Sequence, residues 1–289
     1  MIKRIKRKNL DLDKYTNCLN KAVNYCVYAE FWYLDVVTNK QWDCYIFNDY
    51  EAVMPLPFIK KLGIKIISQP IHCQQLGVFH TANFTENLFT AFLKKLKFNL
   101  VRGYHFNEEN LNYFSEKQPY KINQILNLNS DYNTFKTKLR KNRKQELNKG
   151  LPHPYTIITS VTDTSFLSLL KTEYQEQKQQ LFLDRIAPLV NIIQTKQLGI
   201  TINIIQQNTV VASSFYVKSG KRIIQLFNAK KSNLNFNANT FIVDYMIQEY
   251  QNSDYILDFE GSSIKGVNEF NASFRAITKK IPIYKSTII

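Results

Sequence analysis

The chain has 289 residues, 44% of them hydrophobic, and a formal net charge of +15. This length suits one large or two ordinary domains, and the hydrophobic fraction and the scarcity of Gly and Pro exclude a disordered chain. No window approaches the roughly 20 apolar residues of a membrane helix, and the basic residues 1–8 lead into a polar stretch, unlike a signal peptide. We therefore expect a soluble, cytoplasmic protein.

The positive charge comes mainly from lysine, since only 8 of the 38 basic residues are arginine. A strong positive charge favours an anionic partner, such as nucleic acid, a nucleotide-linked precursor or an anionic membrane surface. Nucleic-acid readers often use Arg for bidentate contacts, however, and abundant Lys, Asn and Ile also follow from an AT-rich genome. Both interpretations stay open at this point.

The cysteines and histidines show no ligand spacing. Cys18, Cys26, Cys44 and Cys73 contain no Cys-x-x-Cys pair, and the four histidines are scattered. We expect no metal site and no disulfide framework, and we expect the cysteines to be buried or half-buried reduced thiols.

The first half of the chain predicts several strands after an amphipathic segment at residues 13–29. The expected strands are residues 42–47, 50–56, 65–68, 76–79 and 100–104. Before the last of these, residues 85–96 have apolar side chains at helical spacing and predict a helix.

The second half repeats this order of elements. Helices are expected at residues 163–176, 186–196, 240–250 and 268–275, and strands at 201–205, 210–217, 222–228, 255–259 and 281–285. Between the halves, Gly and Pro interrupt the chain at residues 148–154. We therefore predict two domains, residues 1–150 and 151–289.

A helix predicted at residues 132–149 carries the densest basic run of the chain. It contains Lys141, Arg143 and Lys144 among further basic residues, with Glu146 as its single acid. At 100° per residue these charges surround most of the helix, so at least one basic face must meet solvent or an anion. An ordinary solvated face and a phosphate site are both compatible with this pattern.

Residues 255–267 are the most informative segment. An apolar strand ends there in Asp258 and Glu260, and small residues including Ser262 follow. A strand that ends on charged and small residues places them at the edge of a sheet, where ligands are commonly bound. The alternative is a structural carboxylate that caps the following turn or pairs with Lys265 or Arg275.

Two sets of motifs resemble the FemAB-like acyltransferases, which are built from two domains of the GNAT (Gcn5-related acetyltransferase) type. The C-terminal set is Asp258-Phe259-Glu260-Gly261 with Phe270, Phe274 and Tyr284. The N-terminal set is Trp32-Tyr33-Leu34-Asp35, the segment 49–57, and Gln74-Gln75-Leu76-Gly77. Together they bracket nearly the whole chain. The resemblance implies an α+β fold of two GNAT-like domains, each a mixed, mostly antiparallel sheet flanked by helices.

The resemblance also implies acyl or aminoacyl transfer to an amine acceptor, on a cell-envelope precursor. The donor would be aminoacyl-tRNA or acyl-CoA, so the partner would be an anionic donor or precursor such as tRNA. The family's long coiled-coil arm has no counterpart in residues 163–196, which predict only short helices. Two alternatives stay open: an acyl-CoA-dependent N-acyltransferase, and a non-enzymatic protein that binds an anion or a partner on the same scaffold.

Aminolysis of an ester or thioester needs a base for the amine and stabilisation of the oxyanion. The catalytic candidates are Glu260 as base, Asp258 at the alternate strand position, and Tyr284 as proton donor to the leaving group. The candidates for substrate binding are Gln74, Gln75, Gly77, Ser262 and Lys265.

Neither half carries the glycine-rich loop that lets backbone N–H groups approach the pyrophosphate of CoA. The corresponding stretches, residues 80–85 and 235–240, contain no glycine. Residues that cap a helix start also suit an anion there. Our candidate phosphate or anion ligands are Lys141, Arg143, Lys144, Asn237, Asn239 and Thr240.

Overall fold

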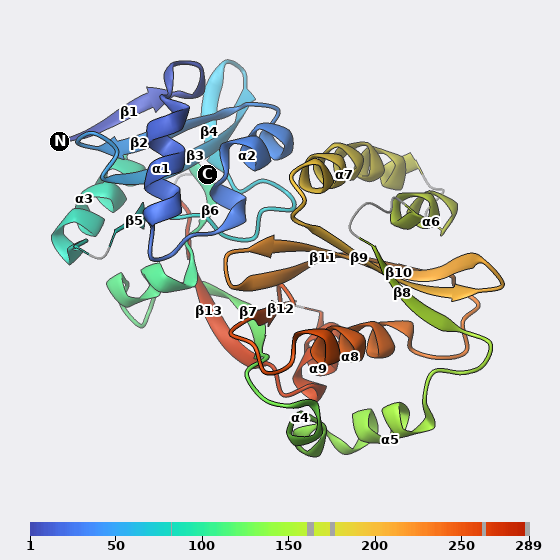
Figure 1. Cartoon of the computed structure of the whole chain (residues 1–289). Coiled ribbons are helices and arrows are strands. Elements are labelled where there is room, and N and C mark those ends of the chain that lie inside the picture. Colours follow the sequence, from blue (N-terminus) through green and yellow to red (C-terminus); the bar gives the residue numbers. More distant parts are fainter. Residues whose placement is uncertain (82, 161–164, 174–176, 262–263, 287–289) are drawn as a thin grey trace. The chain divides into compact units, whose positions relative to one another are not determined.

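The computed structural model describes residues 1–81, 83–160, 165–173, 177–261 and 264–286 (Figure 1). Internal contacts divide the chain into two compact units. Unit 1 comprises Met1–Ile122 with Lys279–Ile289, and unit 2 comprises Asn123–Thr278.

Unit 1 is an α+β unit whose strands follow the order β1-β2-β3-β4-β6-β13, with β5 paired to β3. The strands are β1 (Ile2–Lys6), β2 (Trp42–Phe47), β3 (Ala52–Lys61), β4 (Ile64–Ser68), β5 (Phe79–His80), β6 (Val101–His105) and β13 (Ile277–Tyr284). The helices are α1 (Leu12–Lys21), α2 (Phe31–Thr38) and α3 (Glu86–Lys97), and the 3-10 turns are η1 (Arg7–Asn9), η2 (Val27–Ala29) and η3 (Glu108–Tyr113). Only β4 and β6 are parallel among these pairs with a stated register.

Local capping explains where the helices of unit 1 begin. The Asp11 carboxylate accepts a hydrogen bond from Lys14 N–H at the start of α1, and the Thr85 hydroxyl accepts one from Leu88 N–H at the start of α3. Helix α3 then buries Phe89, Phe92 and Leu96 at helical spacing. The amphipathic segment predicted at residues 13–29 ends as a helix at Lys21.

Unit 2 has strands in the order β7-β12-β11-β10-β9-β8. They are β7 (Tyr120–Asn127), β8 (Thr156–Ser160), β9 (Gly199–Gln206), β10 (Thr209–Ser219), β11 (Arg222–Lys230) and β12 (Ile256–Asp258). The helices are α4 (Tyr132–Lys138), α5 (Lys141–Lys149), α6 (Ser165–Glu173), α7 (Gln177–Thr195), α8 (Ala238–Tyr250) and α9 (Lys265–Ser273). Its sheet is antiparallel except for the parallel pair β11–β12.

Helices cover both faces of the unit 2 sheet. Figure 1 shows α6 and α7 on one side and α8 and α9 on the other. Phe166 of α6 stacks on Phe215 and Phe227 of the sheet, whereas Met246 of α8 belongs to the core that contains Tyr216. Because adjacent strand residues point to opposite faces, the neighbours Phe215 and Tyr216 serve the two layers.

The units divide the chain elsewhere than at residue 150, the boundary that the sequence predicts. Phe135, Leu139 and Leu147 of the α4–α5 region lie in the core of unit 2, so this region belongs to that unit. Strands β7 and β13 both continue from one unit into the other. These associations join segments that are far apart in sequence, and local Gly and Pro punctuation does not reveal them.

The helix predicted over residues 132–149 is two helices, α4 and α5. Leu139 and Arg140 between them are extended, with ψ of 152° and 153°. Arg140 N–H donates to Ser273 O (3.1 Å), and Arg275 Nε donates to Lys138 O (2.6 Å). Hydrogen bonds to the end of α9 therefore replace the helical bonds that the local sequence favours.

The cysteines and the hydropathy of the helices agree with the sequence. All four cysteines are buried and free, so their predicted burial is confirmed. In the part of the chain that the structure describes, no helix combines the length and hydropathy needed to cross a bilayer.

Candidate functional site

Strands β11 and β12 of unit 2 lie side by side only briefly and then separate. Their parallel ladder has three residue pairs and ends at Ile224–Asp258. At that point β11 has a bulge at Leu226, because Gln225 pairs with Tyr216 and Phe227 with Phe215. A bulge bends its strand and increases the local twist, which explains why β11 leaves β12 here. Among the described strands, none pairs with β11 beyond Ile224 on the β12 side.

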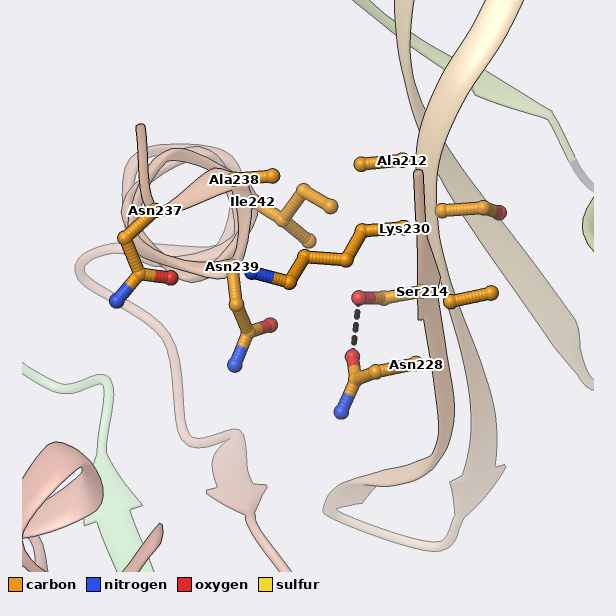
Figure 2. A pocket seen from close by; sticks show the side chains of 10 residues that line it. Ala212, Ser214, Asn228, Lys230, Asn237, Ala238, Asn239 and Ile242 are labelled. Atoms are coloured by element: carbon orange, nitrogen blue, oxygen red, sulfur yellow. Dashed lines mark hydrogen bonds between the residues drawn. The ribbon is translucent and has the colours of Figure 1, made fainter. Parts of the chain in front are cut away.

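A pocket with a volume of about 210 Å³ lies between this part of the sheet and the start of α8 (Figure 2). Its walls are Ala212, Ser213 and Ser214 of β10, Asn228, Ala229 and Lys230 of β11, and Asn237, Ala238, Asn239 and Ile242 at α8. First-turn N–H groups of a helix have no partner within the helix, and the helix dipole adds partial positive charge there. This end of the pocket therefore suits the anionic part of a ligand.

Lys230 lines the pocket but is not among the site residues that the sequence predicts. Figure 2 shows its side chain crossing the pocket so that its ammonium group points toward the first turn of α8, beside Asn239. A cation next to the positive end of a helix dipole is unfavourable unless an anion lies between them. The placement of Lys230 therefore favours a negatively charged ligand. The available signal is that Asn228 and Lys230 occupy alternate positions of one strand and so share a face.

A network of amide and hydroxyl groups orients the polar side chains of the pocket. Gln225 Nε2 lies 2.9 Å from Asn228 Oδ1, 3.1 Å from Asn239 Oδ1 and 3.0 Å from the Tyr216 hydroxyl. The Ser214 hydroxyl also donates to Asn228 Oδ1. Because the side-chain oxygens of both asparagines accept these bonds, their amide nitrogens are oriented as donors for a ligand oxygen.

Asp258 and Glu260 have different environments at the end of β12. Asp258 is buried, and its carboxylate accepts from Arg222 (2.7 Å), Asn123 Nδ2 (3.1 Å) and the Glu260 N–H (2.9 Å). The last of these bonds forms an Asx turn that ends the strand. This geometry suits Asp258 to positioning the strand end, where Glu260 is half-buried.

The backbone at Glu260 is strained. Glu260 and Gly261 both have positive φ, 58° and 56°. A glutamate in the left-handed region costs about 1–3 kcal/mol, and residues held in this way cluster at functional sites. Strand β12 ends at Asp258, where its ladder with β11 also ends, so Glu260 lies just beyond the end of β12.

The two other predicted residues near this strand end differ in what the structure shows. Ser262 lies outside the described residues. Lys265 is exposed at the first position of α9, with its Nζ 4.0 Å from a carboxylate oxygen of Glu269. Its predicted role in substrate binding stays a prediction.

Arg143 is buried, with only 4% of its surface exposed. Its Nε donates to the Ser273 hydroxyl (3.0 Å), and its Nη1 contacts Glu146 and the Thr240 hydroxyl. The guanidinium carbon also lies 4.6 and 4.9 Å from the ring centroids of Phe270 and Phe274. Burial lowers the pKa of Arg143, and the Glu146 carboxylate opposes that shift. Arg143 thus joins α5 to α9 and to the first turn of α8.

The predicted anion ligands are brought together only in part. Asn237 and Asn239 line the pocket, and Thr240 lies next to them in the first turn of α8, bonded to Arg143 and Glu146. Lys144 Nζ donates to Thr137 O (2.6 Å), and Lys141 is exposed on α5. Neither lysine is among the residues that line the pocket.

The predicted substrate ligands of unit 1 make hydrogen bonds inside that unit. Gln75 is buried, and its side-chain oxygen accepts from Glu108 N–H (3.1 Å). Gly77 has φ of 116°, and a Cβ there would lie 2.2 Å from the Asn110 side-chain oxygen, so the position requires glycine. Gln74 contributes its backbone oxygen to the His105 ring Nδ1–H (3.0 Å).

The third catalytic candidate, Tyr284, also belongs to unit 1. It lies on β13, paired with Tyr104 of β6. Asp258 and Glu260 belong to unit 2. A site that combines all three residues stays a prediction.

The chemical groups of the pocket indicate which ligands it can hold. Among the residues that the structure describes, no group of three or more His, Cys, Asp or Glu side chains is placed to hold a metal ion. The groups that line the pocket are side-chain amides, a hydroxyl and an ammonium, which bind carbonyl and phosphate oxygens. A ligand that carries both carbonyl and phosphate oxygens fits these groups.

No protein-family model and no curated protein sequence matches the chain. Solved structures nevertheless share its fold over nearly its whole length. FemX matches with a TM-score of 0.67 at 8% identity, over 96% of both chains. The C-terminal domain (DUF2156) of a putative lysylphosphatidylglycerol synthetase from Agrobacterium fabrum matches with a TM-score of 0.59 at 9% identity, over 94% of this chain and 90% of that one.

A third similar structure is a tandem GNAT protein from the clavulanic acid biosynthesis pathway. It matches with a TM-score of 0.54 at 7% identity, over 98% of both chains. The predicted α+β architecture of two GNAT-like domains is confirmed by these matches and by the mixed, mostly antiparallel sheets of the two units. The chain has a tandem GNAT fold, which it shares with FemX and with the tandem GNAT protein.

Proposed function

We propose that this protein transfers an acyl or aminoacyl group from an activated ester or thioester to an amine. The observation that carries this proposal is the parting of β11 from β12 beside the pocket at the start of α8. An extended amide-containing donor can pair as an added strand with β11 beyond Ile224, where the ladder with β12 ends. The phosphates of the donor then bind at the first turn of α8, near Lys230.

The reaction needs three functions from the protein. The amine nitrogen attacks the carbonyl carbon, the carbonyl oxygen becomes an oxyanion, and the bond to the leaving oxygen or sulfur breaks. Backbone N–H groups on the β11 edge supply the oxyanion donors. Glu260 accepts the proton that the amine loses and returns it to the leaving oxygen or sulfur as that bond breaks, so that a neutral alcohol or thiol departs.

For the donor, we favour an aminoacyl ester over acyl-CoA. No glycine occurs in residues 231–240, before and at the start of α8, and the Asn237 and Asn239 side chains line the pocket. Side chains there keep a pyrophosphate from approaching the backbone as closely as in a glycine-rich loop. The acceptor is proposed to be an amine on a cell-envelope precursor.

The test is a transfer assay with the purified full-length chain. Mixed aminoacyl-tRNA and a panel of acyl-CoA are each incubated with amine-bearing envelope precursors, and the product is identified by mass spectrometry. We expect product from aminoacyl-tRNA. If product formed from acyl-CoA alone, acyl-CoA would be the donor instead of aminoacyl-tRNA. If a donor bound but no product formed, the protein would be a binding protein and not a transferase.

The Glu260→Gln variant tests the proposed base. Gln keeps the size and polarity of the side chain but cannot accept the proton, so we expect kcat to fall by about 100-fold or more while donor affinity is unchanged. Glu249→Gln, at an exposed position of α8, is the matched control and should keep full activity. Full activity of Glu260→Gln would contradict the assignment.

A further inference from the structure

The hairpin of β3 and β4 presents apolar side chains to solvent at its tip. Lys61 pairs with Ile64 across a two-residue turn, Leu62-Gly63. Leu62 is 94% exposed and Ile64 is 55% exposed, and Ile59 on the adjoining strand is also exposed. In Figure 1 this hairpin, drawn in light blue, reaches the periphery of unit 1.

Leu62 occupies a backbone position that disfavours leucine. Leu62 and Gly63 have φ of 50° and 79°, as a type I′ turn requires, and Asn, Asp and Gly are the residues that favour such a turn. A bulky residue with positive φ is strained. Because Leu62 is almost fully exposed, burial within the unit does not offset this strain. The folding of unit 1 therefore gives no reason for leucine here, whereas a surface that receives the side chain does.

Lysines flank the apolar tip. Lys60 and Lys61 are exposed at the end of β3. Lys65, on the other strand, is paired with Asp43 (2.8 Å) and lies over the Phe58 ring. The hairpin end thus combines exposed aliphatic side chains with exposed positive charge.

The neighbouring loop extends the same combination. Ile67 N–H donates to Leu100 O (2.8 Å), so the loop after α3 lies beside β4. Phe98 in this loop is 80% exposed, and Leu100 is also exposed. The last turn of α3 adds the basic residues Lys94, Lys95 and Lys97.

We propose that this end of unit 1 docks on an anionic lipid bilayer. Leu62 enters the boundary between head groups and acyl chains, Ile59 and Ile64 follow it, and Lys60 and Lys61 contact the anionic head groups. A bilayer surface offers an apolar layer beneath a negatively charged one, which matches an apolar tip flanked by lysines. A protein partner would instead need a cavity shaped for one projecting leucine. The inference is independent of the proposed transfer reaction.

Vesicle co-sedimentation of the full-length chain tests the proposal. We expect binding to phosphatidylcholine vesicles that contain phosphatidylglycerol, weaker binding at high salt, and little binding to phosphatidylcholine alone. Leu62→Asn should lower the partition coefficient by about tenfold or more, since it removes the inserted side chain. It should also raise the thermal midpoint, because Asn favours the turn conformation. Lys60→Gln and Lys61→Gln should each lower binding by about fivefold.

Val23→Asn is the matched control. Val23 is 62% exposed, and its N–H bonds to His80 O near Ala52, at the opposite end of β3 from Leu62. Binding by this variant should equal that of the wild type. The proposal is overturned if the wild type ignores anionic vesicles or if Leu62→Asn binds them equally well. It is also overturned if Leu62→Asn only dissociates an oligomer in sedimentation, because the tip would then contact another copy.

Discussion

Arg143 packs against the rings of Phe270 and Phe274, and its guanidinium contacts one carboxylate and two hydroxyl groups. These groups come from α5, α8 and α9, so one side chain fixes the first turn of α8 beside the pocket. The charge of Arg143 is neutralised within the unit by Glu146. Its contribution to the site is therefore the position of Asn239 and Thr240 rather than a direct contact with an anion.

The Arg143→Met variant should be much less stable than the wild type. Methionine keeps apolar contact with Phe270 and Phe274 but leaves Glu146 without its buried partner. We expect the free energy of unfolding to fall by about 3 kcal/mol, measured by urea denaturation. Lys141→Met, at an exposed position of the same helix, should change it by less than about 0.5 kcal/mol. If Arg143→Met were as stable as the wild type but no longer bound phosphate, Arg143 would be an anion ligand, as the sequence predicts.

Single residues of the pocket were predictable only where one local segment carries the signal. Asn237, Asn239 and Thr240 could be selected because polar residues precede an apolar helical pattern. Lys230 could not be selected, because its relation to α8 depends on the bulged register of β10 and β11 and on the packing of α8 against them. The strain at Glu260 is likewise a backbone property that the spacing of Asp258 and Glu260 does not reveal.

The same distinction holds for whole elements. Strand β2 has the predicted bounds, and α3 and β11 differ from theirs by one or two residues, because their hydrophobic periodicity is local. Strands β1, β7 and β8 were not predicted. Half of β7 is exposed, and it becomes a strand by pairing with β12, more than a hundred residues later in the chain. Its partner, rather than its own pattern, determines it.

His105 of β6 makes several hydrogen bonds to the loop between β4 and β5. The His105 ring donates to Gln74 O (3.0 Å), its backbone N–H donates to the Gln69 side chain (3.0 Å), and its backbone oxygen accepts from Leu76 N–H (2.8 Å). The loop is thus held on β6 at several points by one residue. Burial, with a smaller effect from Lys121, lowers the pKa of His105 to about 4.

This arrangement predicts a loss of stability in acid. His105 is neutral in the folded chain, whereas the unfolded histidine binds a proton below pH about 6.5. Its contribution is therefore fully present above pH 6.5 and is lost as the pH falls through 4, by about 3 kcal/mol in total. Burial also lowers the pKa of His80, which acts in the same direction.

Urea denaturation at about pH 7 and about pH 4.5 measures this effect. His105→Gln keeps an amide donor for Gln74 O but does not titrate, so its stability should fall less than that of the wild type between the two values. An equal fall in both proteins would show that other groups cause the acid sensitivity.

At the scale of the whole chain, the presence of two GNAT-like units could be predicted because each half repeats the same order of elements. The limits of the units could not. Unit 2 includes the second part of β7 and both α4 and α5, which precede the predicted boundary, and unit 1 includes the last residues of the chain. Strand pairing across long sequence separations determines these limits, and no local sequence pattern indicates such pairing.

Two fragments distinguish the contact-based unit from the predicted domain. Fragment 123–278 retains the part of β7 that pairs with β12, the buried side chains of α4 and α5, and the Arg143 contacts with α8 and α9. Fragment 151–289 lacks all three, so Leu257 and Phe270 would lose packing partners. We therefore expect cooperative urea unfolding, followed by circular dichroism, for fragment 123–278 and not for fragment 151–289. Cooperative unfolding of 151–289 alone would show that the domain boundary lies near residue 150 after all, and that α4 and α5 are dispensable for the second unit.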